Sequence, residues 1–241
     1  MARARALCWA FGLLASTALV VLGFALDAPF LRWLAQRREA PWEGVAQFVT
    51  HAGDWPPLAL AVVCGVLLAR IFRARRAMTL LGVMFAATLL AGAVVQPVRL
   101  LTGRARPQSQ KAEGWYGLRK DGKWIAGKHR YSSFPSAHTT VAAAFLTPLL
   151  VIGGARCLPV WLLALVVGWT RVYLGAHHPS DVMAGLILGT GCGWLVARSP
   201  GLRWWTWRLA SAFCGFRRFR TGRERGARVL LRGAKSVLVA E

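Results

Sequence analysis

Residues 78–98 read MTLLGVMFAATLLAGAVVQPV, a stretch without a single Asp, Glu, Lys or Arg. A helix rises about 1.5 Å per residue, so a run of this length covers the roughly 30 Å hydrocarbon core of a bilayer. Arginines bound the run on both sides, at Arg75 and Arg76 before it and at Arg99 directly after it. The stretch therefore predicts a transmembrane helix with charged residues at both membrane surfaces.

Five further apolar runs approach or reach the length of a membrane span. They cover residues 7–26, 57–72, 138–153, 158–174 and 182–196. The first begins like a signal peptide, but it has no convincing cleavage site and more spans follow, so we interpret it as a retained anchor. Buried helices of a soluble protein are the alternative for the shorter runs, yet six such runs in 241 residues leave little polar surface.

The predicted fold class is an all-α polytopic membrane helix bundle of about six transmembrane helices. The predicted membrane-embedded domain is 1–200, with its motifs in 99–181, and a basic cytoplasmic tail follows at 201–241. The five cysteines show no metal-ligand spacing and are interpreted as small packing residues.

The charge of the chain is strongly positive, with 31 Lys and Arg against 9 Asp and Glu and a formal net charge of +22. In a soluble protein this balance would point to nucleic acid. Here the positive charge gathers in the short links between apolar runs and at the C-terminus, which is typical of the cytoplasmic side of a membrane protein. We therefore expect membrane as a partner and no nucleic acid.

The basic links also predict an orientation. With six spans, one side of the membrane holds Arg3 and Arg5, the link with Arg70, Arg73, Arg75 and Arg76, the link with Arg156, and the arginine-rich tail. That side should be cytoplasmic, so both termini lie in the cytoplasm of a cell inner membrane. Segments 27–56, 99–137 and 175–181 then face the periplasm or the cell exterior. Two tryptophan groups are expected to form interfacial belts: Trp33, Trp42 and Trp55, and Trp204, Trp205 and Trp207.

Three short polar clusters lie where apolar runs meet the outer segments. They read RLLTGRARP at 99–107, SFPSAHT at 133–139 and TRVYLGAHHPSD at 170–181. Guanidinium groups chelate phosphate oxygens in paired hydrogen bonds, and free backbone N–H groups at a helix start also favour an anion. Of two histidines, one can attack phosphorus and the other can protonate the leaving oxygen. The clusters predict phosphoryl transfer.

The clusters resemble the three motifs of the type-2 phosphatidic acid phosphatase family, which shares its core with vanadium haloperoxidases. The family pattern is Lys, six residues, Arg-Pro; then Pro-Ser-Gly-His; then Ser-Arg, five residues, His, three residues, Asp. This sequence matches the pattern in order and spacing, and the resemblance covers about residues 57–198. It departs at three positions, where Arg99 replaces Lys, Ala137 replaces Gly and Thr170 replaces Ser. No catalytic group is lost.

The resemblance implies a role for each matched residue. His177 would be the nucleophile that forms a phosphohistidine, Asp181 would orient it, and His138 would act as general acid and later activate water. The phosphate would be bound by Arg99, Arg106, Arg171, Ser136 and the Ala137 backbone. Arg99 is expected to contribute charge alone, since the family's lysine shows that a point cation suffices there. No metal and no cofactor are expected, because arginines supply the positive charge that Mg²⁺ supplies elsewhere.

Several nearby polar residues lie outside the pattern. Arg104 is expected to be a solvated loop charge, and His178 to precede a helix start at Pro179 without a direct role. Surface or loop positions are expected for His51, His129, Ser132 and Ser133. Segment 108–134 combines aromatic and cationic side chains, which suit an anionic headgroup, and a mobile solvated loop is the alternative.

The predicted function is hydrolysis of a phosphomonoester or diphosphate of a membrane lipid, of the undecaprenyl diphosphate, phosphatidylglycerol phosphate, phosphatidate or lipid A type. The lipid chain would stay in the bilayer while the headgroup reaches the outer site. The main alternative is a lipid phosphotransferase that uses the same phosphohistidine. A vanadate haloperoxidase is disfavoured by the membrane spans, and a non-catalytic anchor with a basic tail is a further alternative.

Overall fold

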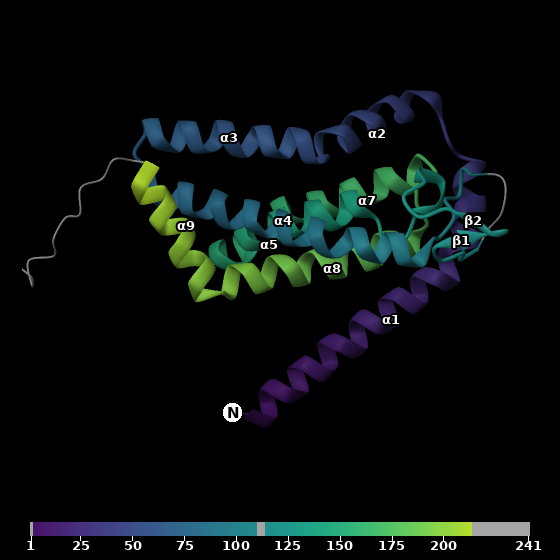
Figure 1. Ribbon diagram of the computed structural model, residues 1–241, viewed down its shortest axis with the longest axis horizontal. Coiled ribbons are helices and arrows are strands. Elements are labelled where there is room, and N and C mark those ends of the chain that lie inside the picture. The colour runs from purple at the N-terminus through teal and green to yellow at the C-terminus, as the bar shows by residue number, and fades with distance from the viewer. Residues whose placement is uncertain (1, 110–113, 214–241) are drawn as a thin grey trace, which may run out of the picture.

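The computed structural model describes residues 2–109 and 114–213, and this part of the chain is mostly helical (Figure 1). The first half consists of α1 (Ala2–Ala35), α2 (Ala40–Ala52), α3 (Trp55–Ile71) and α4 (Arg75–Thr102). A loop with a small hairpin, β1 (Arg119–Lys120) and β2 (Lys123–Trp124), and the 3₁₀ helix η1 (His129–Tyr131) follows. The second half consists of α5 (Ala137–Gly153), η2 (Ala155–Cys157), α6 (Leu158–Trp161), α7 (Leu163–Tyr173), α8 (Pro179–Arg198) and α9 (Pro200–Phe213).

Helices overlap all six predicted apolar runs, but not all of them are long enough to be spans. Within the described residues, four helical segments have the length and apolarity to cross a membrane: Leu14–Ala35, Arg75–Thr102, Ala155–Tyr173 and Pro179–Arg198. A fifth is added if α2 and α3, which are bent by 55° at their junction, form one broken span. The polytopic helical membrane fold is confirmed. The number of about six is not reached on these criteria, because α5 has only 17 residues.

The first helix runs further than the sequence predicted. The apolar run was expected to end at Leu26 with an outer segment starting at Asp27, yet α1 continues to Ala35. The membrane-length part of the helix shifts accordingly to Leu14–Ala35. Asp27 therefore lies inside a helix and is only 7% exposed. A buried carboxylate is stable in such a place only when it is paired, and the partners of Asp27 are described below.

Helices α5 and α8 pack closely through small residues at the centre of the bundle. Gly185, Gly189 and Gly193 recur every fourth residue on one face of α8. A Cβ added to Gly185 would lie 2.8 Å from the carbonyl oxygen of Ser136, and one added to Gly193 would lie 2.8 Å from that of Ala144. Small residues let helix backbones approach closely in membranes, where no hydrophobic effect drives helices together. The contact brings the start of α5 beside the start of α8.

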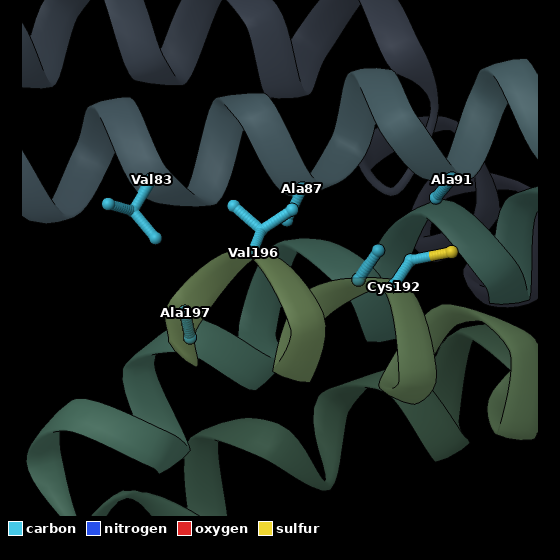
Figure 2. Close-up of a cluster of buried hydrophobic side chains, with 7 residues drawn as sticks. Val83, Ala87, Ala91, Cys192, Val196 and Ala197 are labelled. Atoms are coloured by element: carbon cyan, nitrogen blue, oxygen red, sulfur yellow. The ribbon is translucent and has the colours of Figure 1, made fainter. Parts of the chain in front are cut away.

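An apolar cluster holds α4 against the α5–α8 pair (Figure 2). Its fully or almost fully buried members are Val83, Ala87 and Ala91 of α4, Ala144 of α5, and Cys192, Val196 and Ala197 of α8. Cys192 packs as a small apolar residue, as predicted for the cysteines. A second cluster joins α1 and α2 to α7 and α8 through Leu34, Ala46, Val172, Tyr173 and Val182. The two clusters fix the helix ends that carry the polar motifs.

The two ends of the bundle carry different features (Figure 1). The hairpin β1–β2 and the turn between α7 and α8 lie at one end, while α9 and the basic α3–α4 link lie at the other. Half-exposed tryptophans occur near both ends: Trp33 and Trp42 in α1 and α2, and Trp204, Trp205 and Trp207 in α9. Five of the six tryptophans of the predicted interfacial belts thus lie near the two ends, and the belts themselves stay a prediction. Most of the predicted basic tail, from residue 214 onward, lies outside the described residues.

Candidate active site

The three polar clusters, which are far apart in the sequence, meet at one end of the bundle. The first closes α4 and enters the loop, the second starts α5, and the third spans the turn from α7 into α8. Backbone hydrogen bonds join them: the N–H of Ser136 donates to the carbonyl of Asp181 (3.0 Å), and the N–H of Ser133 donates to the carbonyl of Arg104 (3.1 Å). The fold thus gathers the residues that the sequence singled out.

His177 lies in the turn before α8 and is completely buried. The N–H groups of Ala176 and His177 donate to the carbonyl of Arg171, which folds the turn back over that arginine. The Nδ1 atom of His177 lies 3.5 Å from Oδ2 of Asp181, which is longer than an ordinary N–H···O hydrogen bond. Burial, helped by Arg106 and Arg171 and opposed by Asp181, lowers the pKa of His177 to about 3. The ring is therefore neutral at physiological pH, with a lone pair available for attack.

Buried nitrogen atoms without hydrogen-bond partners mark a candidate anion site. In the described part of the chain, all such side-chain atoms belong to three residues: Nε and Nη1 of Arg106, Nε of Arg171, and both ring nitrogens of His177. An unpaired buried donor costs about 1–3 kcal/mol, and more when it is charged. Groups of this kind are expected to have a ligand, and a tetrahedral oxyanion matches guanidinium donors.

The positive charges near these unpartnered nitrogens also favour an anion as the ligand. Burial, together with repulsion from Arg99 and Arg171, lowers the pKa of Arg106 to about 10. Arg106 therefore keeps its positive charge at neutral pH. Mutual repulsion among three partly buried arginines is relieved when an anion carrying more than one negative charge lies between them.

His138 occupies the first turn of α5, with its side chain one-fifth exposed. Its Nε2 atom lies 2.7 Å from Oδ1 of Asp54, the residue that precedes α3. The sequence reasoning did not single out Asp54. Its only signal was that it is one of few acidic residues in the outer segments. The carboxylate fixes the orientation of the His138 ring at the edge of the site.

Arg99, at the end of α4, is bound to the loop before α5. Its Nε and Nη2 atoms donate to the carbonyl oxygen of Ser132 (3.2 and 2.9 Å), and Nη2 also lies 3.2 Å from the Ser132 hydroxyl. Its Nη1 atom donates to the side chain of Gln96 (3.2 Å). All three nitrogens of the Arg99 guanidinium therefore have protein partners. Arg99 contributes mainly positive charge to the site, with few hydrogen-bond donors left for a ligand. Ser132, which was expected only as a loop residue, is the main partner of Arg99.

Ser136 and Thr170 have structural partners of their own. Ser136 is fully buried, its N–H is used by Asp181, and its hydroxyl oxygen accepts from Thr139 (2.9 Å). Only the proton of the Ser136 hydroxyl and the first N–H groups of α5, starting with Ala137, are left for an anion. The hydroxyl of Thr170 lies 2.7 Å from that of Thr50, which joins α7 to α2.

Asp181 is the most highly connected acid of the site. Its Oδ2 atom accepts hydrogen bonds from the Ser133 hydroxyl (2.5 Å) and from the N–H of His178 (2.8 Å), and it lies 3.2 Å from Nδ1 of His178. His178 does precede α8, as predicted, and in addition contacts Asp181. Ser133 lies in a loop as expected, but it is buried and forms part of the support of Asp181. His51 and His129 are exposed, as predicted.

Arg104 is not the solvated loop charge that the sequence predicted. It is 7% exposed, and it forms ion pairs with Asp181 (2.5 Å) and with Asp27 (2.6 Å). The prediction was wrong because the second carboxylate comes from α1, more than seventy residues away. Nothing local to Arg104 in the sequence signals that contact. An isolated acid directly after an apolar run was the one available hint.

The described part of segment 108–134 is ordered into the hairpin and η1. These elements surround an open cavity of about 1030 Å³ lined mainly by basic side chains: Lys120, Lys123, Lys128, His129 and Arg130, with Asp121, Ile125 and Tyr131. Residues 110–113 lie outside the described residues. The N–H of Arg106 donates to the carbonyl of Arg130 (3.0 Å), so this basic cavity adjoins the anion site.

The comparison with known proteins agrees with the motifs. The family model of the PAP2 superfamily matches residues 77–205, and the chain belongs to this superfamily. The chain is 32% identical over 111 residues to the lipid A 1-phosphatase of Rhizobium etli, which is 46% of this chain and 45% of that protein. It is 34% identical over 71 residues to the undecaprenyl-diphosphatase BcrC of Bacillus subtilis, 30% of this chain and 37% of that protein. These matches span less than half of the length of either relative.

A solved structure shares the fold. The crystal structure of Aquifex aeolicus LpxE superimposes with a TM-score of 0.55 at 21% sequence identity, covering 72% of this chain and 96% of that chain. The helix bundle predicted from the sequence is therefore a fold that a solved structure also has.

Proposed function

We propose that this protein is a membrane lipid phosphatase that hydrolyses a phosphomonoester or diphosphate of a lipid through a phosphohistidine at His177. The observation that carries the proposal is the set of unpartnered buried nitrogens of Arg106, Arg171 and His177, three residues whose charges act on one another in the folded protein. Membership of the PAP2 superfamily and relatives named as lipid phosphatases support it.

In the first step, the substrate phosphate lies against Arg106 and Arg171, and the neutral Nε2 of His177 attacks phosphorus. The Nδ1–H group of His177 faces Asp181, whose carboxylate stabilises the imidazolium that forms. The bond from phosphorus to the lipid oxygen breaks, and protonated His138 gives its proton to that oxygen. Asp54, 2.7 Å from Nε2, favours the protonated form of His138, and the negative charge of the bound phosphate would offset the arginines that oppose it.

In the second step, the lipid product leaves and a water molecule takes its place. Neutral His138 accepts a proton from the water while the water oxygen attacks the phosphohistidine. The P–N bond breaks, phosphate is released and His177 returns to its neutral form. The same two residues thus serve both steps with reversed proton transfer.

We propose that the reaction needs no metal, since Arg99, Arg106 and Arg171 supply the positive charge at the phosphate. The experiment is phosphate release by purified protein from a panel of lipid phosphates and diphosphates, with EDTA and without added metal. We expect hydrolysis of at least one lipid, unaffected by EDTA and inhibited by vanadate as a phosphate mimic. Absence of hydrolysis across the panel would overturn the function, and a loss on chelation that Mg²⁺ restores would overturn metal independence.

A second cavity, of about 440 Å³, fits the lipid part of such a substrate. Its polar lining includes Arg99, His138 and Asp54, and its apolar lining includes Leu89, Gly92, Ala93 and Val141. Gly92 lies seven residues before Arg99 on α4, which is about 10 Å along the helix axis. We propose that the phosphate lies at the polar end and that the first part of the lipid chain follows the apolar lining. The basic cavity at the hairpin would take the rest of an anionic headgroup.

Filling this cavity should change the preference for lipid chains. A Cβ at Gly92 meets no atom within 4 Å, so a side chain can start there, and in Gly92→Leu it would extend into the space that Gly92 lines. We expect kcat/KM for a long-chain lipid phosphate to fall about 10- to 100-fold, with little change for a short-chain analogue. The matched control is Gly191→Leu, because Gly191 on α8 also meets no atom within 4 Å and does not line this cavity. An equal loss in both variants would contradict the assignment.

Substitutions of Arg99 should separate charge from hydrogen bonding. Because its nitrogens are occupied by Ser132 and Gln96, we expect Arg99→Lys to stay within about threefold of wild type in kcat/KM. Arg99→Ala should lose a charge-assisted contact of about 1.5–3 kcal/mol, or roughly ten- to 150-fold. Steady-state kinetics of the two variants and wild type on one lipid phosphate show whether Arg99 acts through its charge or through its hydrogen bonds. If Arg99→Ala matches wild type, Arg99 is only an interfacial charge.

We also propose that the active site faces the periplasm or cell exterior and that both termini are cytoplasmic in a cell inner membrane. The support is the set of arginines in the α3–α4 link and after α8, at the end away from the site. In a background without native cysteines, Asp121→Cys at the exposed hairpin turn should react with an impermeant thiol reagent in intact cells. Exposed Arg76→Cys at the opposite end should react only after lysis. The reverse pattern would overturn the orientation.

A further inference from the structure

Arg104 bridges two buried carboxylates from different helices. Its Nη1 atom contacts Oδ1 of Asp181 (2.5 Å) and the hydroxyl of Ser180 (2.7 Å), and its Nη2 atom contacts Oδ2 of Asp27 (2.6 Å). The side chains of these three ionic residues are each at most 10% exposed. Each of these buried charges relies on the others for stabilisation, so removing one of them would leave a partner unpaired in the protein interior.

Asp27 also binds the first turn of α8 directly. Its Oδ1 atom accepts a hydrogen bond from the N–H of Ser180 (2.9 Å), and its Oδ2 atom accepts one from the Ser180 hydroxyl (2.6 Å). Ser180 is the residue immediately before Asp181. An acidic group at a helix start stabilises the N–H groups that have no partner within the helix. Asp27 therefore holds both Arg104 and the backbone that carries Asp181.

Further residues on the same face of α1 lie close to Arg104 and to the start of α8. Phe24 lies 5.2 Å from the guanidinium of Arg104, and Trp115 of the outer loop lies 4.9 Å from it. At Gly23, an added Cβ would lie 2.9 Å from Cα of Ser180, so α1 approaches the start of α8 closely. Residues 23, 24 and 27 are neighbours on one face of a helix. The C-terminal part of α1 is thus packed against the residues that support Asp181.

The geometry divides the two oxygens of Asp181 between different tasks. Arg104 engages Oδ1, while Oδ2 is the oxygen that faces Nδ1 of His177. A partial rotation of the carboxylate would move Oδ1 away from Arg104 and Oδ2 away from His177, so the Arg104 contact opposes it. The guanidinium also offsets the negative charge of one of two buried carboxylates. The negative charge of Asp181 that Arg104 does not offset lies on the side that faces His177. It stabilises the imidazolium that His177 becomes during the reaction.

We infer that Arg104 is a positioning residue for the reaction, which holds Asp181 so that Oδ2 faces His177, and that Asp27 holds Arg104 in place. The inference rests on the proposed function, and it makes the first membrane helix part of the support of the active site. Asp27 lies outside the three motifs, and Arg104 lies within the first one but not at a position that its pattern specifies.

The test compares three conservative variants with wild type, after each is shown to be monodisperse in detergent: Asp27→Asn, Arg104→Lys and Arg104→Ala. We expect kcat on one lipid phosphate to fall about 10- to 100-fold in Asp27→Asn, by analogy with the loss found when residues that orient metal-bound ligands are replaced. KM should stay within about twofold, because Asp27 and Arg104 support the nucleophile. Arg104→Lys should lie between wild type and Arg104→Ala, since it keeps one ion pair. The matched control Arg32→Ala, an exposed arginine on the same helix, should behave as wild type.

A second measurement distinguishes positioning from a direct role at the phosphate. In an Asp181→Asn background, Arg104→Lys should cause less than about a threefold further loss, because the residue acts through Asp181. Multiplicative losses, or Asp27→Asn with wild-type kcat, would overturn the inference. So would failure of both Asp27→Asn and Arg104→Lys to fold, which would limit the network to stability. If wild-type protein hydrolyses no lipid phosphate, the proposed function fails instead.

Discussion

Replacing His177 with alanine is expected to abolish turnover, lowering kcat about a millionfold, while the protein still folds and inserts. Loss of the nucleophile of a catalytic unit costs about that much in enzymes with covalent intermediates. The fold should survive because neither ring nitrogen of His177 has a hydrogen-bond partner that the substitution would strand. The neighbouring Arg106 and Arg171 remain, so phosphate binding should persist with little reaction.

The phosphohistidine gives this prediction a direct measurement. Enzyme mixed briefly with substrate labelled in its phosphate, and denatured under alkaline conditions that preserve phosphohistidine, should carry label in wild type. No label should remain bound to His177→Ala. A matched control is His51→Ala, an exposed histidine outside the site, which should label like wild type. Label retained on His177→Ala would show that another residue is the nucleophile.

The pKa of His177 adds a pH dependence to the same comparison. Burial lowers this pKa from 6.5 to about 3, so the folded protein resists a proton that the unfolded chain accepts. The stabilising contribution is therefore fully present above about pH 6.5 and is lost as the pH falls towards 3. Thermal unfolding in detergent should show wild type losing stability over this interval more steeply than His177→Ala. Equal slopes would contradict a buried neutral histidine.

Replacing Arg106 with alanine is expected to have the second largest effect, lowering kcat/KM about a hundred- to a thousandfold. Arg106 is 5% exposed, and its Nε and Nη1 atoms are free to donate to phosphate oxygens. Removing one donor that stabilises the charge of a transition state typically costs about 2.7–4 kcal/mol. Arg106→Lys should recover only part of the loss, because an ammonium cannot form two parallel hydrogen bonds to a phosphate.

The stability of the Arg106 variants provides the control for this prediction. Because no carboxylate among the residues that the structure describes forms an ion pair with Arg106, its removal should leave thermal stability unchanged or slightly raised. Exposed Arg156→Ala, at the opposite end of the bundle, should change neither activity nor stability. An Arg106→Ala protein with wild-type kcat/KM would remove this arginine from the phosphate site. A loss of activity that is explained entirely by unfolding of Arg106→Ala would also contradict the assignment of Arg106 to the phosphate site.

Some features of this protein follow from local sequence. Apolar runs such as 78–98 predicted helical membrane segments because the hydrophobic length that a bilayer requires is a property of consecutive residues. The three motifs predicted the site because residues with fixed spacing around a helix start or a tight turn keep the same relative placement. His177 and Asp181, four residues apart across the start of α8, are such a pair.

Other features depend on contacts between distant segments. The number of about six spans is not reached because α5 has only 17 residues, and because residues 57–72 attain membrane length only together with α2, across a bend that their hydropathy does not show. The pairing of Asp54 with His138 and of Asp27 with Arg104 joins residues 77 to 84 positions apart. Asp27 looked like the end of a membrane segment and Arg104 like a loop charge.

The sequence by itself determined the helical membrane class, the superfamily motifs and the candidate chemistry, because each is encoded over a few neighbouring residues. Only the tertiary structure decided which of the remaining charges belong to the site. The energy of a buried charge depends on the partners that surround it, and those partners are chosen by helix packing. The close α5–α8 contact through Gly185, Gly189 and Gly193, and the approach of α1 to Ser180, bring Arg104 out of solvent and place it against Asp181.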